Sequence, residues 1–266
     1  MTHEFFLYER PRPHVARITI NRPERRNAVH PAAHREWSEL LDEAAADDDV
    51  WIVVITGVGD DAFCAGRDLK QLAEMSRAPA SQRQAEQAMM RSVRRLVERF
   101  DYPKPLIARV NGAALGGGFE VVLACDIAIS AEHATFGLPE PRRGIYAGGG
   151  GVHRLPRQIP LKVAMGFLLT GRTMSAAEAF GLGLLNEVAP PGGLDEAVDR
   201  WIDDILECAP LSVRATKQAA MRGLDLPLEL AFADDYPAVA AMRASEDSVE
   251  GPRAFAEKRP PRWSGR

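Results

Sequence analysis

The chain has 266 residues, 46% of them hydrophobic, with a formal net charge of −4 at pH 7 and a pI near 5.9. This length can bury the core of one large domain, or of one domain with a small appendage. The acidic balance gives no sign of a nucleic-acid-binding surface.

The three cysteines are odd in number, lie far apart and form no Cys-x-x-Cys pair, as is typical of a protein from a reducing compartment. The N-terminus lacks the pattern of a secretory signal, and no apolar stretch reaches the ~18 residues that a membrane span needs. We therefore expect a cytoplasmic globular protein with no nucleic-acid or membrane partner.

Hydrophobic periodicity predicts strands that alternate with helices, followed by a helical tail. The expected strands are a hairpin over 5–8 and 14–20, then 51–56, 105–110, 126–130 and a short segment at 184–188. The expected helices are 31–46, a segment with Met90, Val93, Leu96, Val97 and Phe100 on one face, the segment after Gly116, the segment after Gly148–Gly151, and nearly everything from 161 onward. The segment from 70 to about 84 is polar and looks mobile. This order predicts an α/β fold with a C-terminal helical region.

Gly116, Gly117 and Gly118 lie where an apolar strand turns into a helix that carries Glu120 in its first turn. Without Cβ atoms, the backbone N–H groups of such a turn can approach a ligand closely, and the positive end of the helix suits a developing anion. Alternatively, the glycines allow a tight helix–sheet contact, and Glu120 simply complements the helix dipole.

Other motifs fail. The pattern Gly57-x-Gly59-x-x-Ala62 resembles a dinucleotide fingerprint, but Asp60 and Asp61 would repel a pyrophosphate and no apolar helix begins there. There is no Gly-x-Ser-x-Gly, P-loop or His-Glu-x-x-His motif, and the six histidines are scattered.

An ordered set of segments resembles the crotonase (enoyl-CoA hydratase/isomerase) superfamily over essentially the whole chain. The segments are ITINRP at 18–23, NA at 27–28, FCAGRDL at 63–69, NGAALGGGFE at 111–120, CDI at 125–127, FGLPE at 136–140, the second glycine run with RL at 154–155, and FAEKR at 255–259. The resemblance implies a spiral of repeated ββα units over 1–200. It also implies a C-terminal helical region, 201–266, that covers the active site and supports a homotrimer or hexamer.

By the same resemblance, the substrate is an acyl-CoA thioester. The backbone N–H groups of Arg67 and Gly117 would form an oxyanion hole, while the Arg67 side chain points to solvent or touches CoA phosphates. Glu140 would be the principal acid/base and Glu120 would orient a water molecule, with support from the N–H of Gly148. Otherwise Glu140 is only a loop acid after Pro139.

CoA binding is implied for residues on the first two loops and near the C-terminus, the latter from a neighbouring subunit. These residues are Arg25, Arg26, Ala28, Ala65, Asp68, Leu69, Phe255 and Lys258. Glu24 stands where the family often has lysine, so the phosphate partner stays open, and Arg25 and Arg26 are equally well explained as exposed charges. Ala147 replaces a proline common in short-chain hydratases, and Tyr146 either lines the acyl pocket or simply packs.

The function expected is 2-enoyl-CoA hydration, by syn addition of water across C2–C3, with no metal or redox cofactor because CoA is part of the substrate. Isomerisation, dehydration or C–C cleavage on the same fold is the alternative, and a non-catalytic binding protein is a further one. The acyl group and the pathway stay open.

Overall fold

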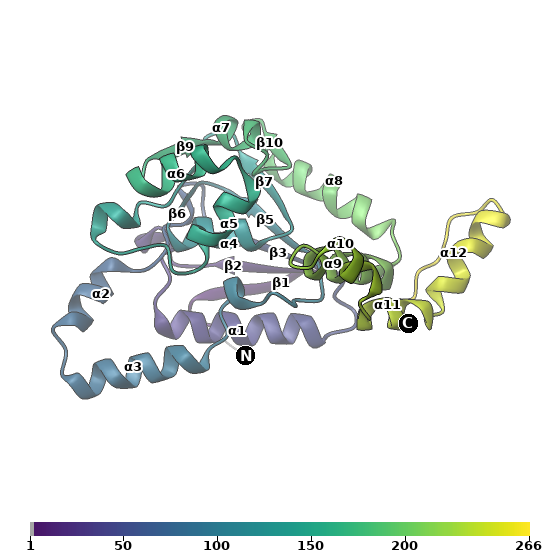
Figure 1. The fold of residues 1–266 in the computed structure, drawn as a ribbon, viewed down its shortest axis with the longest axis horizontal. Helices are drawn as coiled ribbons and strands as arrows, with labels where there is room; N and C mark the ends of the chain where they lie inside the picture. Colours follow the sequence, from purple (N-terminus) through teal and green to yellow (C-terminus); the bar gives the residue numbers. More distant parts are fainter. Residues whose placement is uncertain (1–2) are drawn as a thin grey trace.

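Two β-sheets form the centre of the molecule, which the computed structural model describes over residues 3–266 (Figure 1). The larger sheet has the order β1-β2-β3-β5-β7-β10, with β1 antiparallel to β2 and the other pairs parallel. The smaller sheet has the order β4-β6-β8-β9, with β9 antiparallel to β8. The strands are β1 (Phe6–Arg12), β2 (Val15–Ile20), β3 (Ile52–Gly57), β4 (Ala62–Cys64), β5 (Leu106–Val110), β6 (Ala113–Leu115), β7 (Ile127–Ala131), β8 (Thr135–Gly137), β9 (Thr173–Ser175) and β10 (Glu187–Ala189).

The helices surround these sheets. They are α1 (Pro31–Ala46), α2 (Leu69–Ser76), α3 (Ala80–Ser92), α4 (Gly117–Ala124), α5 (Gly151–Gln158), α6 (Leu161–Thr170), α7 (Ala176–Gly181), α8 (Leu194–Leu206), α9 (Pro210–Gly223), α10 (Leu228–Ala233), α11 (Pro237–Arg243) and α12 (Asp247–Ala256), with 3₁₀ turns η1 (Pro23–Arg25), η2 (Leu96–Glu98) and η3 (Glu140–Arg143). In Figure 1, α2 and α3 project at one end of the molecule and α12 at the opposite end.

The chain repeats one unit three times. Each of β3, β5 and β7 enters the large sheet, the next strand (β4, β6 or β8) enters the small sheet, and α2, α4 or η3 follows. Because β4, β6 and β8 are parallel neighbours, the turns after them lie side by side at one edge of the small sheet. The repeated ββα units implied by the resemblance are therefore present, and they bring three predicted site segments together.

The first four residues of strand β3, from Ile52 to Ile55, are all apolar. Ile52 and Val54 belong to the hydrophobic cluster beneath α8, whereas Val53 and Ile55 belong to the cluster on the other face of the sheet. Since both faces of this strand are buried, these residues do not alternate with polar ones, and the buried Thr56 that follows donates its hydroxyl to Arg109 O. The predictions for this strand, for the hairpin β1–β2 and for the helix over 31–46 are confirmed.

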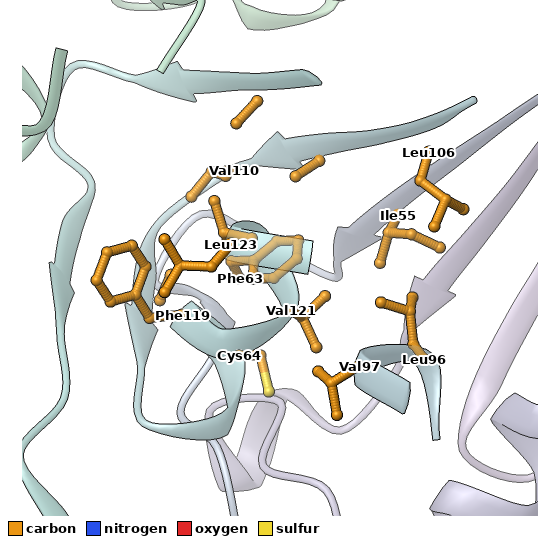
Figure 2. Close-up of a cluster of buried hydrophobic side chains, with 14 of the residues drawn as sticks. Ile55, Phe63, Cys64, Leu96, Val97, Leu106, Val110, Phe119, Val121 and Leu123 are labelled. Atoms are coloured by element: carbon orange, nitrogen blue, oxygen red, sulfur yellow. The ribbon is translucent and has the colours of Figure 1, made fainter. Parts of the chain in front are cut away.

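Helix α4 is anchored in the core. In Figure 2, Phe119, Val121 and Leu123 from this helix gather with Phe63 from β4 and Val97 from η2. Burying a large apolar side chain contributes about 1.5–3 kcal/mol each. The helix that carries Glu120 is thus held rigidly.

One helix prediction is wrong. The apolar spacing from Met90 to Phe100 does not form a continuous helix, because α3 ends at Ser92 and Val93 is extended. A capping box between Arg95 and Glu98 starts η2 instead, and Phe100 is 73% exposed. The buried residues Leu96 and Val97 reach the core from this short turn.

Other corrections concern segments outside the main core. The segment from 70 to about 84, where mobility was expected, is largely helical in α2 and the first part of α3. Thr173–Ser175 is a strand inside the region predicted as helical. The short strand expected at 184–188 occurs at Glu187–Ala189. The loop from Gly57 leads into β4 and not into the helix that a dinucleotide fingerprint requires.

The proposed division at residue 200 stays a prediction; this position lies inside α8, which packs on β7 and β10. Among residues 3–266, none of the helices has the length and apolar content needed to span a bilayer.

Candidate active site

The glycine turn before α4 places Glu120 in a cavity. Gly116 has φ of 54° and donates its N–H to Gly137 O at 2.9 Å, which ties the turn to β8. A Cβ on Gly118 would lie 2.0 Å from Cys64 O, so this position requires glycine for close packing. The two interpretations of this turn are therefore compatible. The glycines allow close packing of the helix on β4, and Glu120, which is 5% exposed, lines the cavity.

The second glycine run holds the Glu120 carboxylate. The N–H of Gly151 donates to Oε1 at 2.8 Å, and the N–H of Gly149 also hydrogen-bonds this carboxylate. A Cβ on Gly149 would lie 2.3 Å from Oε2. Burial raises the pKa of Glu120, while these N–H groups and the charge of Arg95 act in the opposite direction. Glu120 is thus fixed in place by the backbone of a neighbouring loop.

Glu140 begins η3, directly after Pro139, and is 7% exposed. Burial, with a smaller contribution from the charge of Glu120, raises its pKa to about 7. Its Oε2 has no hydrogen-bond partner within residues 3–266. A carboxyl with this pKa can both accept and donate a proton near neutral pH.

The two carboxylates face the same turn. A Cβ on Gly116 would lie 2.9 Å from Glu140 Oε1, and a Cβ on Gly117 would lie 3.9 Å from Glu120 Oε2. Small residues at this turn therefore leave room for both acids on one side of the cavity.

Two backbone N–H groups lie beside these acids. Val29 forms a parallel bridge with Arg67, in which Val29 N donates to Gly66 O at 2.8 Å and Asp68 N donates to Val29 O at 3.2 Å. A Cβ on Gly66 would lie 2.7 Å from Gly117 N. Neither the N–H of Arg67 nor that of Gly117 donates to any described residue. Both donors are therefore free to bind an oxyanion.

A cavity of about 1020 Å³ joins these groups. Its floor is formed by the turns at Gly66–Arg67, Gly116–Gly117 and Gly148–Gly149 with Glu120 and Glu140. Its remaining wall comes from α1, α3, η2 and the η3 loop; the polar members are His34, Glu86, Gln87, Arg91, Arg95, Glu98 and Arg143. A space of this size suits a ligand of small-molecule dimensions.

The sequence matches the Enoyl-CoA hydratase/isomerase family model over residues 11–266. The chain belongs to this family. It is 38% identical over 252 residues to (E)-benzylidenesuccinyl-CoA hydratase of Thauera aromatica, and the aligned region covers 95% of this chain and 96% of that protein. It is also 38% identical over 267 residues to carnitinyl-CoA dehydratase of Proteus mirabilis (strain HI4320), with 98% of each chain covered.

The fold agrees with this assignment. The crystal structure of enoyl-CoA hydratase from Bacillus anthracis superposes with a TM-score of 0.89 at 35% identity, covering 99% of this chain and all of that one. An enoyl-CoA hydratase from Mycobacterium tuberculosis H37Rv gives 0.85 at 37% identity, covering 98% and 99% of the two chains. The protein therefore has the crotonase fold and is a crotonase-family enzyme that acts on CoA thioesters as a hydratase or dehydratase.

The CoA-binding residues predicted from the resemblance are only partly brought to this crotonase site. Ala65 and Leu69 line the cavity, as does Arg67, whose side chain is exposed. Arg25 and Arg26 lie on the surface at η1, next to the buried Ala28. The N–H of Ala65 donates to Arg26 O at 3.0 Å, so the two predicted loops are neighbours. CoA contacts at these residues stay predictions.

The Asp68 side chain makes its contacts within its own chain. Its carboxylate accepts from the N–H groups of Lys70 and Gln71 at 3.2 Å, capping α2, and pairs with Arg22 at 3.2 Å. Burial opposes ionisation, but these hydrogen bonds and Arg22 leave its pKa below the ordinary value. Asp68 thus shapes the loop that presents Arg67.

Two predicted residues lie away from the cavity of their own chain. Phe255, on α12, is 87% exposed, and Lys258 follows the end of that helix. Figure 1 places α12 at the opposite end of the molecule from α2 and α3. One chain therefore does not bring them to its own site.

Several wall residues were missed. His34 and Trp37 line the cavity from one face of α1, and Arg95 and Glu98 line it from η2. In the sequence, His34 lies one turn before Trp37 on the apolar side of the predicted helix over 31–46. A polar residue at that position was the one feature that could have indicated a cavity there. Of the two possibilities given for Tyr146, lining the pocket or only packing against neighbours, the structure shows the first, because Tyr146 lines the cavity. Gly148 lines it too, although it is Gly149 and Gly151 that bind Glu120.

Proposed function

We propose that this protein is a 2-enoyl-CoA hydratase that adds water syn across the C2–C3 double bond of its substrate. The supporting observation is the joint placement of Glu120 and Glu140 at one glycine turn, beside the free N–H groups of Arg67 and Gly117. Reaction of a thioester through an enolate requires these two components: acid–base groups on one side, and donors where negative charge grows.

In this mechanism, the thioester oxygen accepts hydrogen bonds from Arg67 N–H and Gly117 N–H. Glu120, ionised and held by the second glycine run, accepts a hydrogen bond from the attacking water. Glu140 takes one proton from that water as its oxygen bonds to C3 and the double-bond electrons move into the enolate. Glu140 then returns the proton to C2, so one water is added and the enzyme is regenerated. One oxyanion donor is worth about 3–4 kcal/mol in the transition state.

The alternatives differ in what they require. Dehydration is the same reaction in reverse and would use the same groups. A Δ3,Δ2-isomerase needs one base, so the presence of two buried carboxylates favours hydration. C–C cleavage would use the same oxyanion hole. Two buried carboxylates beside it, one with a pKa raised to about 7, favour catalysis over a binding protein without activity.

The C-terminal region supports self-association as a homotrimer or hexamer. Its helices expose large apolar side chains, including Leu224 at 79%, Leu228 at 73% and Phe232 at 86%. Covering such side chains favours association of subunits. In such an assembly Phe255 and Lys258 would contact CoA bound to a neighbouring subunit, while Arg25 and Arg26 contact CoA bound to their own. We assign no metal or redox cofactor, and a cytoplasmic location.

The test is to identify the product from crotonyl-CoA and longer 2-enoyl-CoAs in D2O by mass spectrometry and NMR. Hydration predicts a 3-hydroxyacyl-CoA that has gained one water and carries one deuterium at C2, syn to the new hydroxyl. A change of double-bond position without gain of water would identify an isomerase, and cleavage into two products a lyase. No turnover of any 2-enoyl-CoA would overturn the hydratase assignment.

A further inference from the structure

Arg95 is placed where it can contact the acyl group. Its backbone N–H and its guanidinium both bind the Glu98 carboxylate, which fixes the side chain at the start of η2. The side chain is 28% exposed and lines the cavity. Its charge acts on Glu120, so it lies near the groups that perform the reaction.

The guanidinium keeps donors to spare. Its hydrogen bond to Glu98 uses Nη2, and the remaining N–H groups have no acceptor within residues 3–266. An arginine with one edge held by a carboxylate presents a planar set of donors to a second acceptor, in the geometry that matches another carboxylate.

The charge of the wall is positive. Apart from the catalytic pair, four arginines and two glutamates line the cavity. Arg67 belongs to the floor, and the wall carries Arg91, Arg95 and Arg143 with Glu86 and Glu98. In the part of the chain that the structure describes, Arg95 is the only one of the four arginines in an ion pair. Even with Arg67 assigned to CoA phosphates, the excess of positive charge remains. Such a wall favours an anion over a cation.

His34 supports the same conclusion from α1. It lines the cavity, and its imidazole has no hydrogen-bond partner among the described residues. Burial, reinforced by the charge of Arg95, lowers the pKa of His34 to about 4, so the ring is neutral and carries one N–H donor. An alkyl chain would cover His34 and Arg95 without satisfying them, at a cost that a polar substituent would remove.

We infer that the acyl group taken by this site carries a carboxylate beyond C3, bound by the free edge of Arg95 with a hydrogen bond from His34. The substrate class is then a 2-enedioyl-CoA thioester, with one end esterified to CoA and the other ionised. This inference rests on the proposed function for the reaction at C2–C3, and it adds the residues that select the substrate.

The experiment compares matched substrates of equal carbon number. Pent-2-enedioyl-CoA is paired with pent-2-enoyl-CoA, and hex-2-enedioyl-CoA with hex-2-enoyl-CoA, and kcat/KM is measured for each. The wild type should favour the diacid by about tenfold or more in at least one pair, because a hydrogen bond to a charged group is involved. Arg95→Met should reduce that preference about 10–100-fold, and Arg95→Lys should reduce it less. Arg94→Met is the matched control, since Arg94 is exposed, pairs with Asp101 and does not line the cavity.

The outcomes separate the two proposals. A wild type that favours the monoacid in both pairs, or an Arg95→Met enzyme with an unchanged preference, overturns the inference while hydratase activity stands. If the wild type hydrates neither the four thioesters nor any other 2-enoyl-CoA, the proposed function fails, and binding decides the inference alone.

Titration calorimetry of the wild type would then compare hexanedioyl-CoA with hexanoyl-CoA, and pentanedioyl-CoA with pentanoyl-CoA. Equal affinities within both pairs would overturn it, and tighter binding of a diacid would support it. Because these comparisons need only the wild type, they decide the inference even if Arg95→Met does not fold.

Discussion

The floor and the wall of the cavity are built differently. The floor consists of buried acids and glycine turns whose positions are set by backbone hydrogen bonds and close packing, as at Gly118 and Gly149. The wall is formed by α1, α3, η2 and the η3 loop, with Leu69 at the start of α2. Helices α2 and α3 have no fully buried residues, and η2 adds the long side chains of Arg95 and Glu98.

This difference separates chemistry from selectivity. A reaction through an enolate needs donors and acids fixed within a fraction of an ångström, which packed backbone provides. The choice of acyl group needs only a change of side chains on a half-exposed surface, which costs little stability. Substitutions in the floor should therefore reduce turnover of all substrates, and substitutions in the wall should change their ranking.

The largest effect is expected for Glu120→Gln. The amide can still accept from Gly151 N–H but carries no charge with which to orient the attacking water. We expect kcat for crotonyl-CoA to fall about 10²–10⁴-fold with little change in KM. The exposed Glu132→Gln serves as the control. Wild-type turnover in the Glu120 variant would show that this acid has no part in the reaction.

Gly149→Ala should act on the same carboxylate without removing it. The new Cβ would lie 2.3 Å from Glu120 Oε2, which must move. A displacement of this order reduces kcat by about 10²-fold. Gly166→Ala on α6 is the matched control, because a Cβ there meets open space. Equal kinetics for the two variants would mean that the position of Glu120 is not critical.

A smaller effect concerns stability and pH. Burial raises the pKa of Glu140 from 4.5 to about 7, so the folded state binds more protons than the unfolded state between these values. The stability contributed by this group is therefore present at low pH and is lost as the pH rises through about 7. Glu140→Gln should raise the free energy of unfolding at pH 8 by about 1–2 kcal/mol relative to the wild type, and much less at pH 4.5. Denaturant titrations at both values measure this, and a variant equally or less stable at pH 8 would contradict the burial argument.

The smallest effect is expected in the wall. Leu69 lines the cavity but is 43% exposed, so Leu69→Ala should change the free energy of unfolding by less than about 0.5 kcal/mol. The ranking of short against long 2-enoyl-CoAs should shift about 2–5-fold in kcat/KM, since few methylene contacts are lost. The neighbouring Lys70→Ala should leave the ranking unchanged. An equal loss for all chain lengths would place Leu69 in the floor and not in the wall.

The same division explains what could be predicted from the sequence. The glycine turn before Glu120 is a local pattern and was visible in the sequence, but that pattern alone left two interpretations open. Arg67, Glu140 and Gly148 were assigned only by the resemblance to the crotonase superfamily. Strand β3 and helix α1 were predicted because burial on two faces or one face leaves a clear period. Helix α1 has the predicted bounds and begins at Pro31, whereas β3 lies one residue later in the sequence than the predicted 51–56.

The wall could not be predicted in the same way. The apolar spacing from Met90 to Phe100 looked helical, but Leu96 and Val97 reach the core from a 3₁₀ turn that the Arg95–Glu98 capping box begins. The charge of Arg95 acts on His34 only because α1 and η2 pack together, and no local sequence pattern indicates that packing. Contacts between distant segments depend on packing, which a single sequence does not encode in its periodicity.

The most direct test of the catalytic assignment is the pH dependence of kcat/KM for crotonyl-CoA, followed by loss of the conjugated-thioester absorbance, in the wild type and in Glu140→Gln. Because Glu140 must be ionised to activate water, hydration by the wild type should rise with pH through about 7 and then level off. The variant should lose at least about 10²-fold in activity and this rise with it. A variant that retains both its activity and the same pH profile would contradict the assignment of Glu140 as the acid/base.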